Sequence, residues 1–257
     1  MTGIATLRRY LAANRFMPAP PPELMFCGDG DFRAIGAEFL EHLVQQAGLT
    51  PSQRVLDIGC GIGRLALPLT QYLDESGRYQ GVDPVENGIS WCKAHVTPIY
   101  PNFEFSYFDV QHDLYNPKGT RSCTSVPLSF ADGSFDLICL ISVLTHLNEP
   151  ELLHYASEAV RLLAPGGRCF VTAFLLNPPA RDALAAGLGK IGFDPASTAE
   201  TQYGDPAAPL AAVAFDEDFF LEKFLRHGLR RQEPGQYGHW SGRDALNFQD
   251  ICIFERS

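Results

Sequence analysis

The stretch that decides the fold is Val55-Leu56-Asp57-Ile58-Gly59-Cys60-Gly61-Ile62-Gly63-Arg64. An apolar, strand-like run holds an acid near its end, and three glycines at alternate positions lead from it into a helical pattern. Glycines in a strand-to-helix turn let a ligand lie against the backbone where side chains would clash. The carboxylate of Asp57 repels a phosphate and attracts an ammonium or sulfonium group. We therefore predict a site for a cationic ligand at this turn.

A second acid ends the next strand-like run. Asp83 follows Tyr79-Gln80-Gly81-Val82 and comes 20 residues after Gly63. An acid at this place accepts hydrogen bonds from both hydroxyls of a ribose. Each acid also has a purely structural interpretation, because Asp57 can cap a helix and Asp83 can close a turn before Pro84. Their order and spacing together favour a nucleoside cofactor.

Around this motif the chain alternates strand and helix patterns. Such βαβ units indicate a doubly wound, mostly parallel sheet. A short connection between the last two strands implies an antiparallel pair. The expected strands are 54–58, 79–82, 103–108, 135–142, 168–176, 229–237 and 248–254, and the expected helices are 2–16, 35–48, 64–73, 85–95, 151–163 and 216–226. Pro165-Gly166-Gly167 is expected to be a turn, and 177–212 an insertion or lid with a weak helical patch at 181–188.

Composition limits the function classes. The 257 residues carry a net charge of −10, which disfavours nucleic acid as a partner because duplex binding requires a basic face. No apolar run reaches the ~20 residues of a membrane span, and Met1 to Phe16 lacks the apolar core of a signal peptide. The seven cysteines are odd in number and form no CxxC pair. We expect reduced thiols, a cytoplasmic location and no metal site.

From Pro51 to Leu176 the sequence resembles the class I S-adenosylmethionine-dependent methyltransferases. The resemblance is carried by VLDIGCGIGR at 55–64, YQGVDP at 79–84, FDV at 108–110, LSFADGSFDLI at 128–138 and RLLAPGGRCFVTAF at 161–174. It implies a Rossmann-like α/β fold, with a seven-stranded, mostly parallel sheet and an antiparallel C-terminal strand. It also implies S-adenosyl-L-methionine as cofactor.

The resemblance assigns cofactor roles by position. Asp57 and the glycine backbone would hold the methionine part, Asp83 the ribose, and Asp109 the adenine amino group. The Val110 backbone would lie beside the adenine, and Ile141 would line the methyl-donor region. The cofactor-binding residues expected on this basis are Asp57, Gly59, Cys60, Gly61, Gly63, Asp83, Asp109, Val110 and Ile141.

The methyl acceptor has to be inferred from local motifs. The Asn/Asp-Pro-Pro-aromatic motif of DNA and glutamine amino-methyltransferases is missing after the fourth strand, where Ile141-Ser142-Val143-Leu144-Thr145-His146 stands. Asn177-Pro178-Pro179-Ala180 follows the fifth strand and lacks the aromatic residue. His146 is the candidate general base, because it comes just beyond the carboxyl end of a parallel strand. His239 is its rival, and each histidine also has a structural interpretation. His154 is expected at the surface.

These observations predict a small-molecule methyltransferase acting on an oxygen of a sugar, a lipid-linked saccharide or a secondary metabolite. Residues 1–50 are expected to form a helical cap and 51–257 the methyltransferase domain, with the cap and the 177–212 insertion shaping the acceptor pocket. The alternatives are an N-methyltransferase on a small amine or protein side chain, and a cofactor-binding scaffold without catalysis. A nicotinamide oxidoreductase is disfavoured by Asp57. Asp132, Asp136 and Glu149 are not expected to converge on a metal. The oligomeric state stays open.

Overall fold

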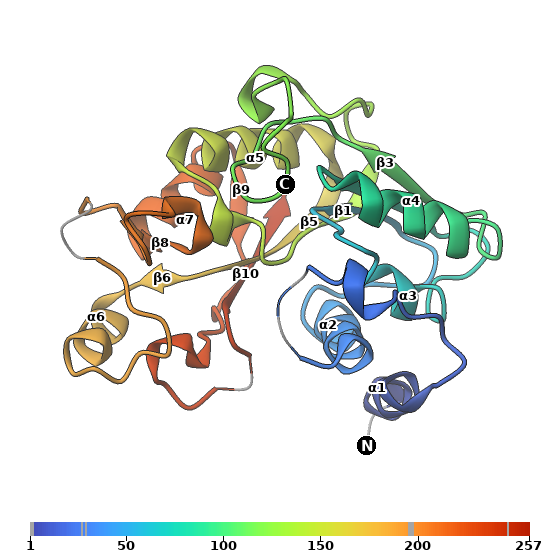
Figure 1. The fold of residues 1–257 in the computed structure, drawn as a ribbon, viewed down its shortest axis with the longest axis horizontal. Helices are drawn as coiled ribbons and strands as arrows, with labels where there is room; N and C mark the ends of the chain where they lie inside the picture. The colour runs from blue at the N-terminus through green and yellow to red at the C-terminus, as the bar shows by residue number, and fades with distance from the viewer. Residues whose placement is uncertain (1–2, 27, 29, 195–197, 246) are drawn as a thin grey trace. The chain divides into compact units, whose positions relative to one another are not determined.

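A computed structural model describes residues 3–26, 28, 30–194, 198–245 and 247–257. Strand β1, which precedes the glycine turn, is the third strand of a seven-stranded sheet with the order β3-β2-β1-β4-β5-β10-β9. The β1–β2, β2–β3 and β1–β4 pairs are parallel, whereas β10 is antiparallel to both β5 and β9. The predicted Rossmann-like sheet with a reversed C-terminal strand is confirmed (Figure 1).

Contacts divide the chain into two compact units, one of residues 1–120 and 135–139 and one of 121–134 and 140–257. The first unit holds α1 (Gly3–Ala13), η1 (Pro22–Leu24), α2 (Phe32–Gln45), β1 (Arg54–Ile58), α3 (Ala66–Leu69), β2 (Arg78–Asp83), α4 (Glu86–His95), β3 (Phe103–Tyr107) and most of β4 (Phe135–Leu140). The expected division at residue 50 remains a proposal.

The remaining elements belong to the second unit. It holds η2 (Cys123–Ser125), η3 (Leu144–His146), α5 (Glu149–Leu162), β5 (Leu163–Ala173), β6 (Leu175–Leu176), α6 (Pro178–Ala185), β7 (Thr201–Tyr203), η4 (Pro209–Ala211), β8 (Val213–Asp216), α7 (Glu217–Leu225), β9 (Leu229–Arg231), η5 (His239–Ser241) and β10 (Asp250–Arg256). Strands β6, β8 and β7 form a separate small sheet. The 177–212 segment thus contributes α6, β7 and η4, and its residues 195–197 lie outside the described part of the chain.

Three elements differ from the sequence prediction. The helix expected at 64–73 shrinks to α3, because Pro68 has no N–H with which to bond the carbonyl four residues earlier. The turn expected at 165–167 is absorbed into β5, where Gly166 bends the strand with φ +74°. The strand expected at 229–237 ends at Arg231, shortly before Pro234, which cannot donate to a sheet.

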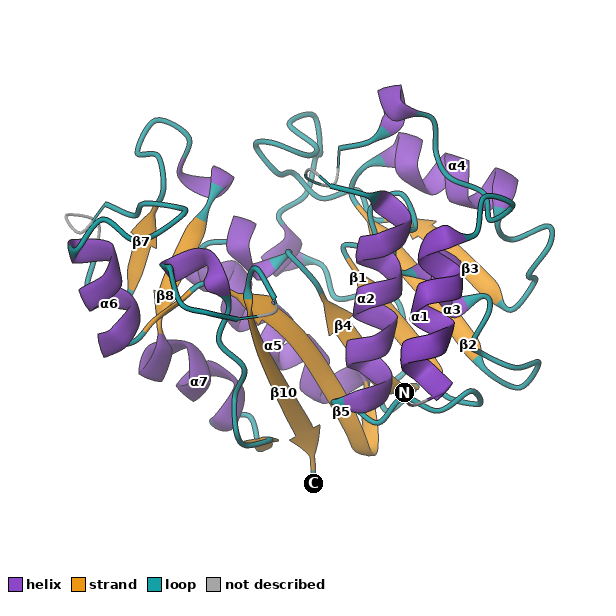
Figure 2. Ribbon diagram, turned by 90° about the horizontal axis from the view of Figure 1, so that it is seen from below, coloured by secondary structure: helices purple, strands orange, loops and turns teal. Residues whose placement is uncertain are grey.

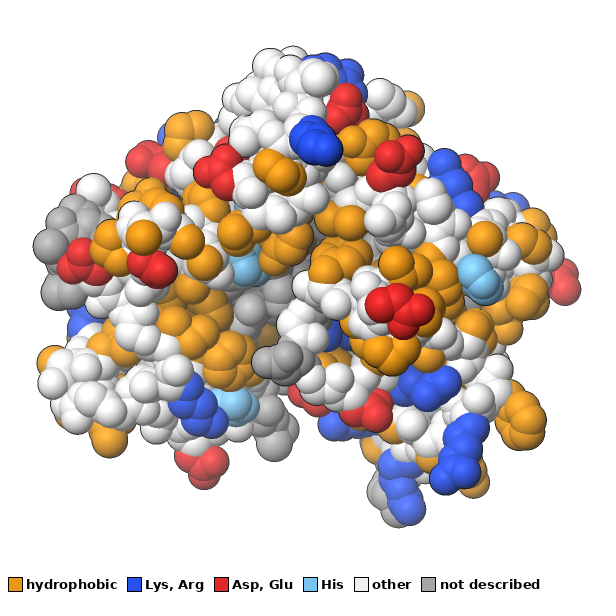
Figure 3. All heavy atoms as spheres, viewed as in Figure 1, with side chains coloured by type: hydrophobic (Ala, Val, Ile, Leu, Met, Phe, Trp, Pro, Cys, Tyr) orange, Lys and Arg blue, Asp and Glu red, His pale blue; other side chains and the backbone are white. Residues whose placement is uncertain are grey.

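Helices α1 and α2 lie side by side in the first unit (Figure 2). The first 22 residues contain three arginines and no acid, and blue side chains gather over α1 in Figure 3. Arg8 donates to Glu41 at 2.7 Å and to Glu38 at 3.4 Å, both on α2. A Cβ on Gly36 of α2 would collide with the carbonyl oxygen of Arg64. Close helix contact therefore brings α2 onto the chain that follows the glycine turn.

None of the helices in the described part of the chain is long and apolar enough to cross a bilayer. Six of the seven cysteines are buried and form no disulfide among the described residues, and Cys27 lies outside them. Within the same residues, no cluster of three or more His, Cys, Asp or Glu side chains is placed to hold a metal ion. Asp136 instead bonds Arg54 of β1, and Asp132 bonds Arg161.

Candidate cofactor and acceptor sites

The glycine turn adopts a conformation that requires glycine. Gly59, Gly61 and Gly63 have φ values of +75°, +58° and +82°, in the left-handed region that side-chain-bearing residues rarely occupy. A Cβ on Gly63 would also come within 2.9 Å of the Cys92 sulfur. The three alternate glycines of the sequence are thus the three residues of this turn that adopt the left-handed conformation.

The N–H groups of this turn point into the protein. Gly59 and Cys60 both donate to the carbonyl of Val82, at 2.8 and 3.1 Å, and Gly63 donates to the carbonyl of Cys60 at 3.0 Å. The Gly61 N–H donates to Asp83 Oδ2 at 2.7 Å. A dinucleotide-binding turn presents such N–H groups to a diphosphate. Here four of them are already bonded within the chain, so the turn suits a ligand without phosphates.

Cys60 lies beneath the turn, in the core. Its side chain is 5% exposed. A Cβ on Gly81 of β2 would come within 2.8 Å of the Cys60 sulfur. The thiol therefore fills the space that Gly81 leaves open, and the predicted contact with a cofactor remains a proposal for this residue.

Asp83 accepts backbone hydrogen bonds in the turn, which is the structural role that Pro84 beside it suggested. Its Oδ1 accepts the Val85 N–H at 2.8 Å, while its Oδ2 holds Gly61. Burial raises the pKa of this carboxyl to about 6, against the lowering effect of the two N–H donors. Each carboxylate oxygen keeps a second lone pair for a further donor. Asp83 can therefore fix the turn and also accept ribose hydroxyls, and the second role is a proposal.

Asp57 does not cap a helix, because α3 starts at Ala66 without a side-chain cap. Its Oδ2 accepts the Tyr79 hydroxyl at 2.6 Å, and both side chains are at most 2% exposed. Burial is the largest cause that raises the pKa of Asp57, to about 7 in all; the Asp83 charge acts in the same direction, whereas the Tyr79 hydrogen bond and the Arg64 charge oppose the rise. The Tyr79 partner was missed from sequence, although Tyr79 lies two residues before Gly81, the register partner of Asp57 on the parallel neighbour strand, and therefore on the same face of the sheet.

These raised pKa values predict a pH-dependent stability of the ligand-free protein. Between its ordinary pKa of 3.8 and about 7, folded Asp57 keeps a proton that the unfolded chain releases, so stability falls as the pH rises through this window. From pH 5.5 to 7.5 we expect Asp57 alone to lower the free energy of unfolding by on the order of 1–2 kcal/mol. Asp57→Asn should remove this part of the slope in urea unfolding. An unchanged slope, or an equal change in the exposed-turn control Asp74→Asn, contradicts the assignment.

Asp109 and Val110 follow β3 and are clamped by one asparagine. Asn116 Nδ2 donates to the Val110 carbonyl at 3.0 Å and to Asp109 at 3.4 Å. The Val110 N–H donates to Phe108 at 2.8 Å, and the Phe108 N–H donates to the Asp83 carbonyl at 3.0 Å. A single chain of backbone bonds thus links the predicted adenine and ribose residues. Their contacts with a cofactor remain proposals.

Ile141 and His146 belong to the second unit. Strand β4 ends one residue after Cys139, the register partner of Asp57, and Ile141 is the next residue of the chain. His146 ends η3, and its Nδ1 lies 3.0 Å from the Leu210 carbonyl in η4. A carbonyl only accepts, so Nδ1 carries the proton and the basic nitrogen of the neutral ring is Nε2.

The rival histidine is differently arranged. Lys190 Nζ lies 2.8 Å from His239 Nδ1. An ammonium only donates, so Nδ1 of a neutral His239 is an acceptor already in use. The residue is therefore a weaker base candidate than His146. His154, expected at the surface, is partly buried on α5, and burial lowers its pKa.

Phe174 and Trp240 are core residues. Phe174 is 3% and Trp240 is 0% exposed, and their rings pack 5.2 Å apart. Trp240 Nε1 donates to Asp250 at 2.8 Å, and the N–H groups of Leu175 and Gly238 bond the same carboxyl. This buried acid ties β10 to β6 and η5, and its pKa is raised to about 6 by burial.

Residues 55–167 match the family described as a methyltransferase domain. The chain is similar to phosphoethanolamine N-methyltransferase 3 of Arabidopsis thaliana, with 27% identity over 65% of this chain and 30% of that protein. Over residues 55–167 the chain therefore carries a methyltransferase domain, as its resemblance to the class I S-adenosylmethionine-dependent methyltransferases implied. Another relative is 27-O-demethylrifamycin SV methyltransferase of Amycolatopsis mediterranei, 27% identical over 70% of this chain and 69% of that protein.

The chain also shares its fold with the PH0226 protein of Pyrococcus horikoshii OT3. That structure has 17% identity and a TM-score of 0.61, with 92% of this chain and 96% of the other covered. The chain spans about a third of the length of the first relative named above. Since the two named relatives methylate nitrogen and oxygen respectively, the methyltransferase domain leaves the acceptor atom open.

Proposed function

We propose that this protein transfers a methyl group from S-adenosylmethionine to a hydroxyl of a small molecule. The observation that carries the cofactor assignment is the glycine turn, whose N–H groups bond inward while two carboxyls, Asp57 and Asp83, accompany it. This arrangement favours a cationic nucleoside over a dinucleotide. Bound S-adenosylmethionine supplies an electrophilic methyl group on a sulfonium.

In this proposal the residues of the chain bind the cofactor, orient the acceptor and deprotonate its hydroxyl. The turn and Asp83 hold the nucleoside and methionine parts, Asp109 the adenine, and Ile141 the methyl-donor region. Alignment of the acceptor supplies several kcal/mol of the barrier reduction. His146 Nε2 takes the hydroxyl proton while its Nδ1–H stays on Leu210, which keeps the imidazole oriented. The hydrogen bond at Nδ1 makes Nε2 the basic nitrogen of the neutral ring. A hydroxyl needs such a base more than an amine does, so this arrangement favours oxygen over nitrogen as the acceptor atom.

The small-molecule assignment rests on charge and on the segment between β6 and β8. The net charge of −10 disfavours nucleic acid, and α6, β7 and η4 form an ordered insertion suited to cover a small acceptor. A competition titration of S-adenosylmethionine against NAD tests the cofactor class. A methyl-transfer screen over sugars, phenols and amines then tests the acceptor. Transfer to amines alone supports the N-methyltransferase alternative, and binding without any transfer supports the scaffold.

Asp83→Ala tests the ribose assignment. The change removes the acceptor of two ribose hydroxyls, so affinity for S-adenosylhomocysteine should fall by about 2–3 kcal/mol in calorimetric titration. It also leaves the Gly61 and Val85 N–H groups without their acceptor, so the melting temperature should fall as well. Asp74→Ala is the matched control, since Asp74 accepts backbone N–H groups in a turn at the opposite end of β2. Unchanged affinity in Asp83→Ala contradicts the ribose role.

Chelation is expected to leave the activity intact. Two of the three acids considered as metal ligands are engaged elsewhere, with Asp136 on Arg54 and Asp132 on Arg161. Methyl transfer measured after exhaustive EDTA treatment should match the untreated rate. Recovery of a lost rate by Mg²⁺ would overturn this expectation.

A further inference from the structure

The C-terminal end of α1 exposes aromatic and basic side chains together. Tyr10 on the helix is 71% exposed, and Phe16, in the turn that follows the helix, is 98% exposed. Arg9 and Arg15, their neighbours in the sequence, are exposed as well. Single apolar side chains at a surface need no explanation, whereas a group of them marks an interaction site. We call Arg9, Tyr10, Arg15 and Phe16 the basic aromatic patch.

The exposure of Phe16 is built into an anchored turn. The Phe16 N–H donates to Asn14 Oδ1 at 3.0 Å, and the Asn14 N–H donates to the Leu11 carbonyl at 3.2 Å. On the other side, Met17 is 5% exposed, and its carbonyl accepts from Arg33 Nη2 at 2.9 Å. The backbone is therefore held before and after Phe16, and the folded protein presents this ring to solvent.

The patch is positive on an acidic protein. The first 22 residues hold three arginines and no acid, whereas the whole chain carries a net charge of −10. The acids of α2 that approach α1, Glu38 and Glu41, are engaged by Arg8. Basic side chains accordingly gather over α1 (Figure 3). An anionic surface attracts this end of the first unit and repels the acidic remainder, so charge alone orients the protein toward such a surface.

The shape and size of the patch favour a bilayer over a protein as the partner. A protruding Phe16 ring fits a deformable interface, in which it reaches the acyl boundary while Tyr10 stays at the headgroup level. Arginine side chains extend to the lipid phosphates and keep their stems in the apolar layer. Two aromatic and two basic side chains also fall short of the roughly 20–30 residues that each side of a stable protein interface contributes.

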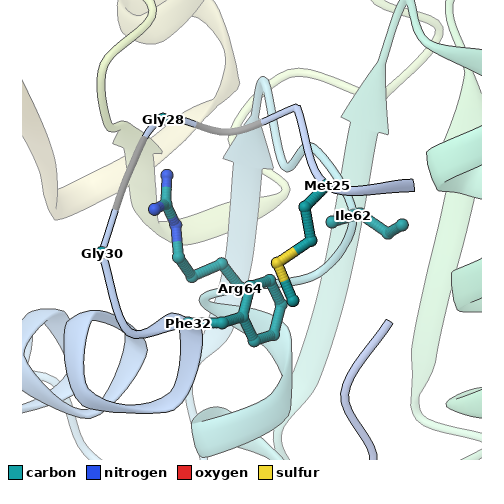
Figure 4. Close-up of a pocket in the computed structure, with 6 residues that line it drawn as sticks. All are labelled: Met25, Gly28, Gly30, Phe32, Ile62 and Arg64. Carbon is teal, nitrogen blue, oxygen red and sulfur yellow. The ribbon is translucent and has the colours of Figure 1, made fainter. Parts of the chain in front are cut away.

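We propose that the basic aromatic patch binds the surface of an anionic lipid bilayer. The protein then lies on the membrane without crossing it, in keeping with the absence of a membrane-spanning helix from the described residues. The chain continues from the patch to Met25, which lines a pocket with Phe32, Ile62 and Arg64 (Figure 4). Ile62 belongs to the glycine turn, so docking brings this turn close to the bilayer.

Co-sedimentation of the full chain with vesicles tests the proposal. Vesicles of phosphatidylcholine and phosphatidylglycerol in about equal amounts should bind the wild type about tenfold more tightly than phosphatidylcholine alone. Salt at about 1 M, which shortens the Debye length to about 3 Å, should release most of the protein. Phe16→Ser should weaken binding to the mixed vesicles by about tenfold. Arg9→Gln and Arg15→Gln should each weaken it by about fivefold.

The end of α7 offers a matched control. Leu225 is 43% exposed and is followed by the exposed Arg226, but the acid Glu222 stands one turn earlier on the same helix. Leu225→Ser and Arg226→Gln should therefore bind the mixed vesicles as the wild type does. All of these variants should keep the wild-type melting temperature, because the changed side chains are exposed.

Four results overturn the proposal. The wild type binds neither kind of vesicle, or it binds both equally. The patch variants bind as the wild type does, or the α7 variants weaken binding as much as the patch variants do.

Two further results assign the patch to another partner and overturn the proposal as well. If Phe16→Ser converts a dimer into a monomer and leaves vesicle binding unchanged, a second copy of the chain covers the patch. If soluble polyglutamate binds the wild type more tightly than the mixed vesicles do, the patch is a site for an acidic protein. The assay contains neither cofactor nor methyl acceptor, so none of these results bears on the proposed methyl transfer.

Discussion

Replacing Gly61 by valine is expected to abolish measurable binding of S-adenosylhomocysteine while the protein stays folded. A β-branched residue at φ +58° is strained by about 1–3 kcal/mol, which lies within the usual stability of a domain. The turn can relieve this strain only by moving, and movement breaks the Gly61–Asp83 bond of 2.7 Å. The cradle and the ribose acceptor are then lost together.

Gly187→Val is the matched control for this change. Gly187 has φ +72° and open space around its Cβ position, and it follows α6. Both variants should lower the melting temperature by a similar amount, and only Gly61→Val should lose the calorimetric binding signal. Normal affinity in Gly61→Val would show that the turn does not hold the cofactor.

His146→Asn is expected to lower kcat by about 100-fold or more once an acceptor hydroxyl has been identified. The asparagine amide can still donate to the Leu210 carbonyl, so the link between η3 and η4 survives. Asparagine cannot take a proton at neutral pH, so this change removes the general base and keeps the hydrogen bond to Leu210. Affinity for S-adenosylhomocysteine should stay within about threefold, because only the chemical step is affected.

His146→Ala and His239→Asn separate the remaining explanations. The alanine variant removes the bond to Leu210 as well, so it should lose some stability in addition to its rate. His239→Asn should retain most of the activity, since Lys190 already donates to the Nδ1 of His239. Full activity in His146→Asn would leave His146 as a positioning residue, and a large loss in His239→Asn would transfer the base to that position.

Several features could be predicted from the sequence because local rules decide them. Alternate glycines after an apolar run predict left-handed residues in a turn, and all three are found at positive φ. A short connection between the last strands predicted an antiparallel pair; β9 and β10 form that pair, although residues 232–249 make the connection longer than expected. Asp57 and Asp83 could be singled out because strand ends in a parallel sheet meet at one edge.

Other features depend on partners that are distant in sequence. The inward bonding of the turn N–H groups requires the Val82 carbonyl and Asp83, and the burial of Asp57 requires Tyr79. The tautomers of His146 and His239 are decided by Leu210 and Lys190, which lie 64 and 49 residues away along the chain. No local pattern encodes such pairings, because they arise when separate elements pack against each other.

The sequence by itself determined the sheet, its reversed last strand, the glycine turn and the family resemblance, since these follow from periodicity, backbone preferences and motif order. Tertiary structure alone decided which polar groups remain usable for a ligand. Phe174 and Trp240 are core, and Arg64 lines a pocket beside the turn. The physical reason is that burial and hydrogen-bond satisfaction belong to the packed chain as a whole, whereas turn and strand preferences belong to a few adjacent residues.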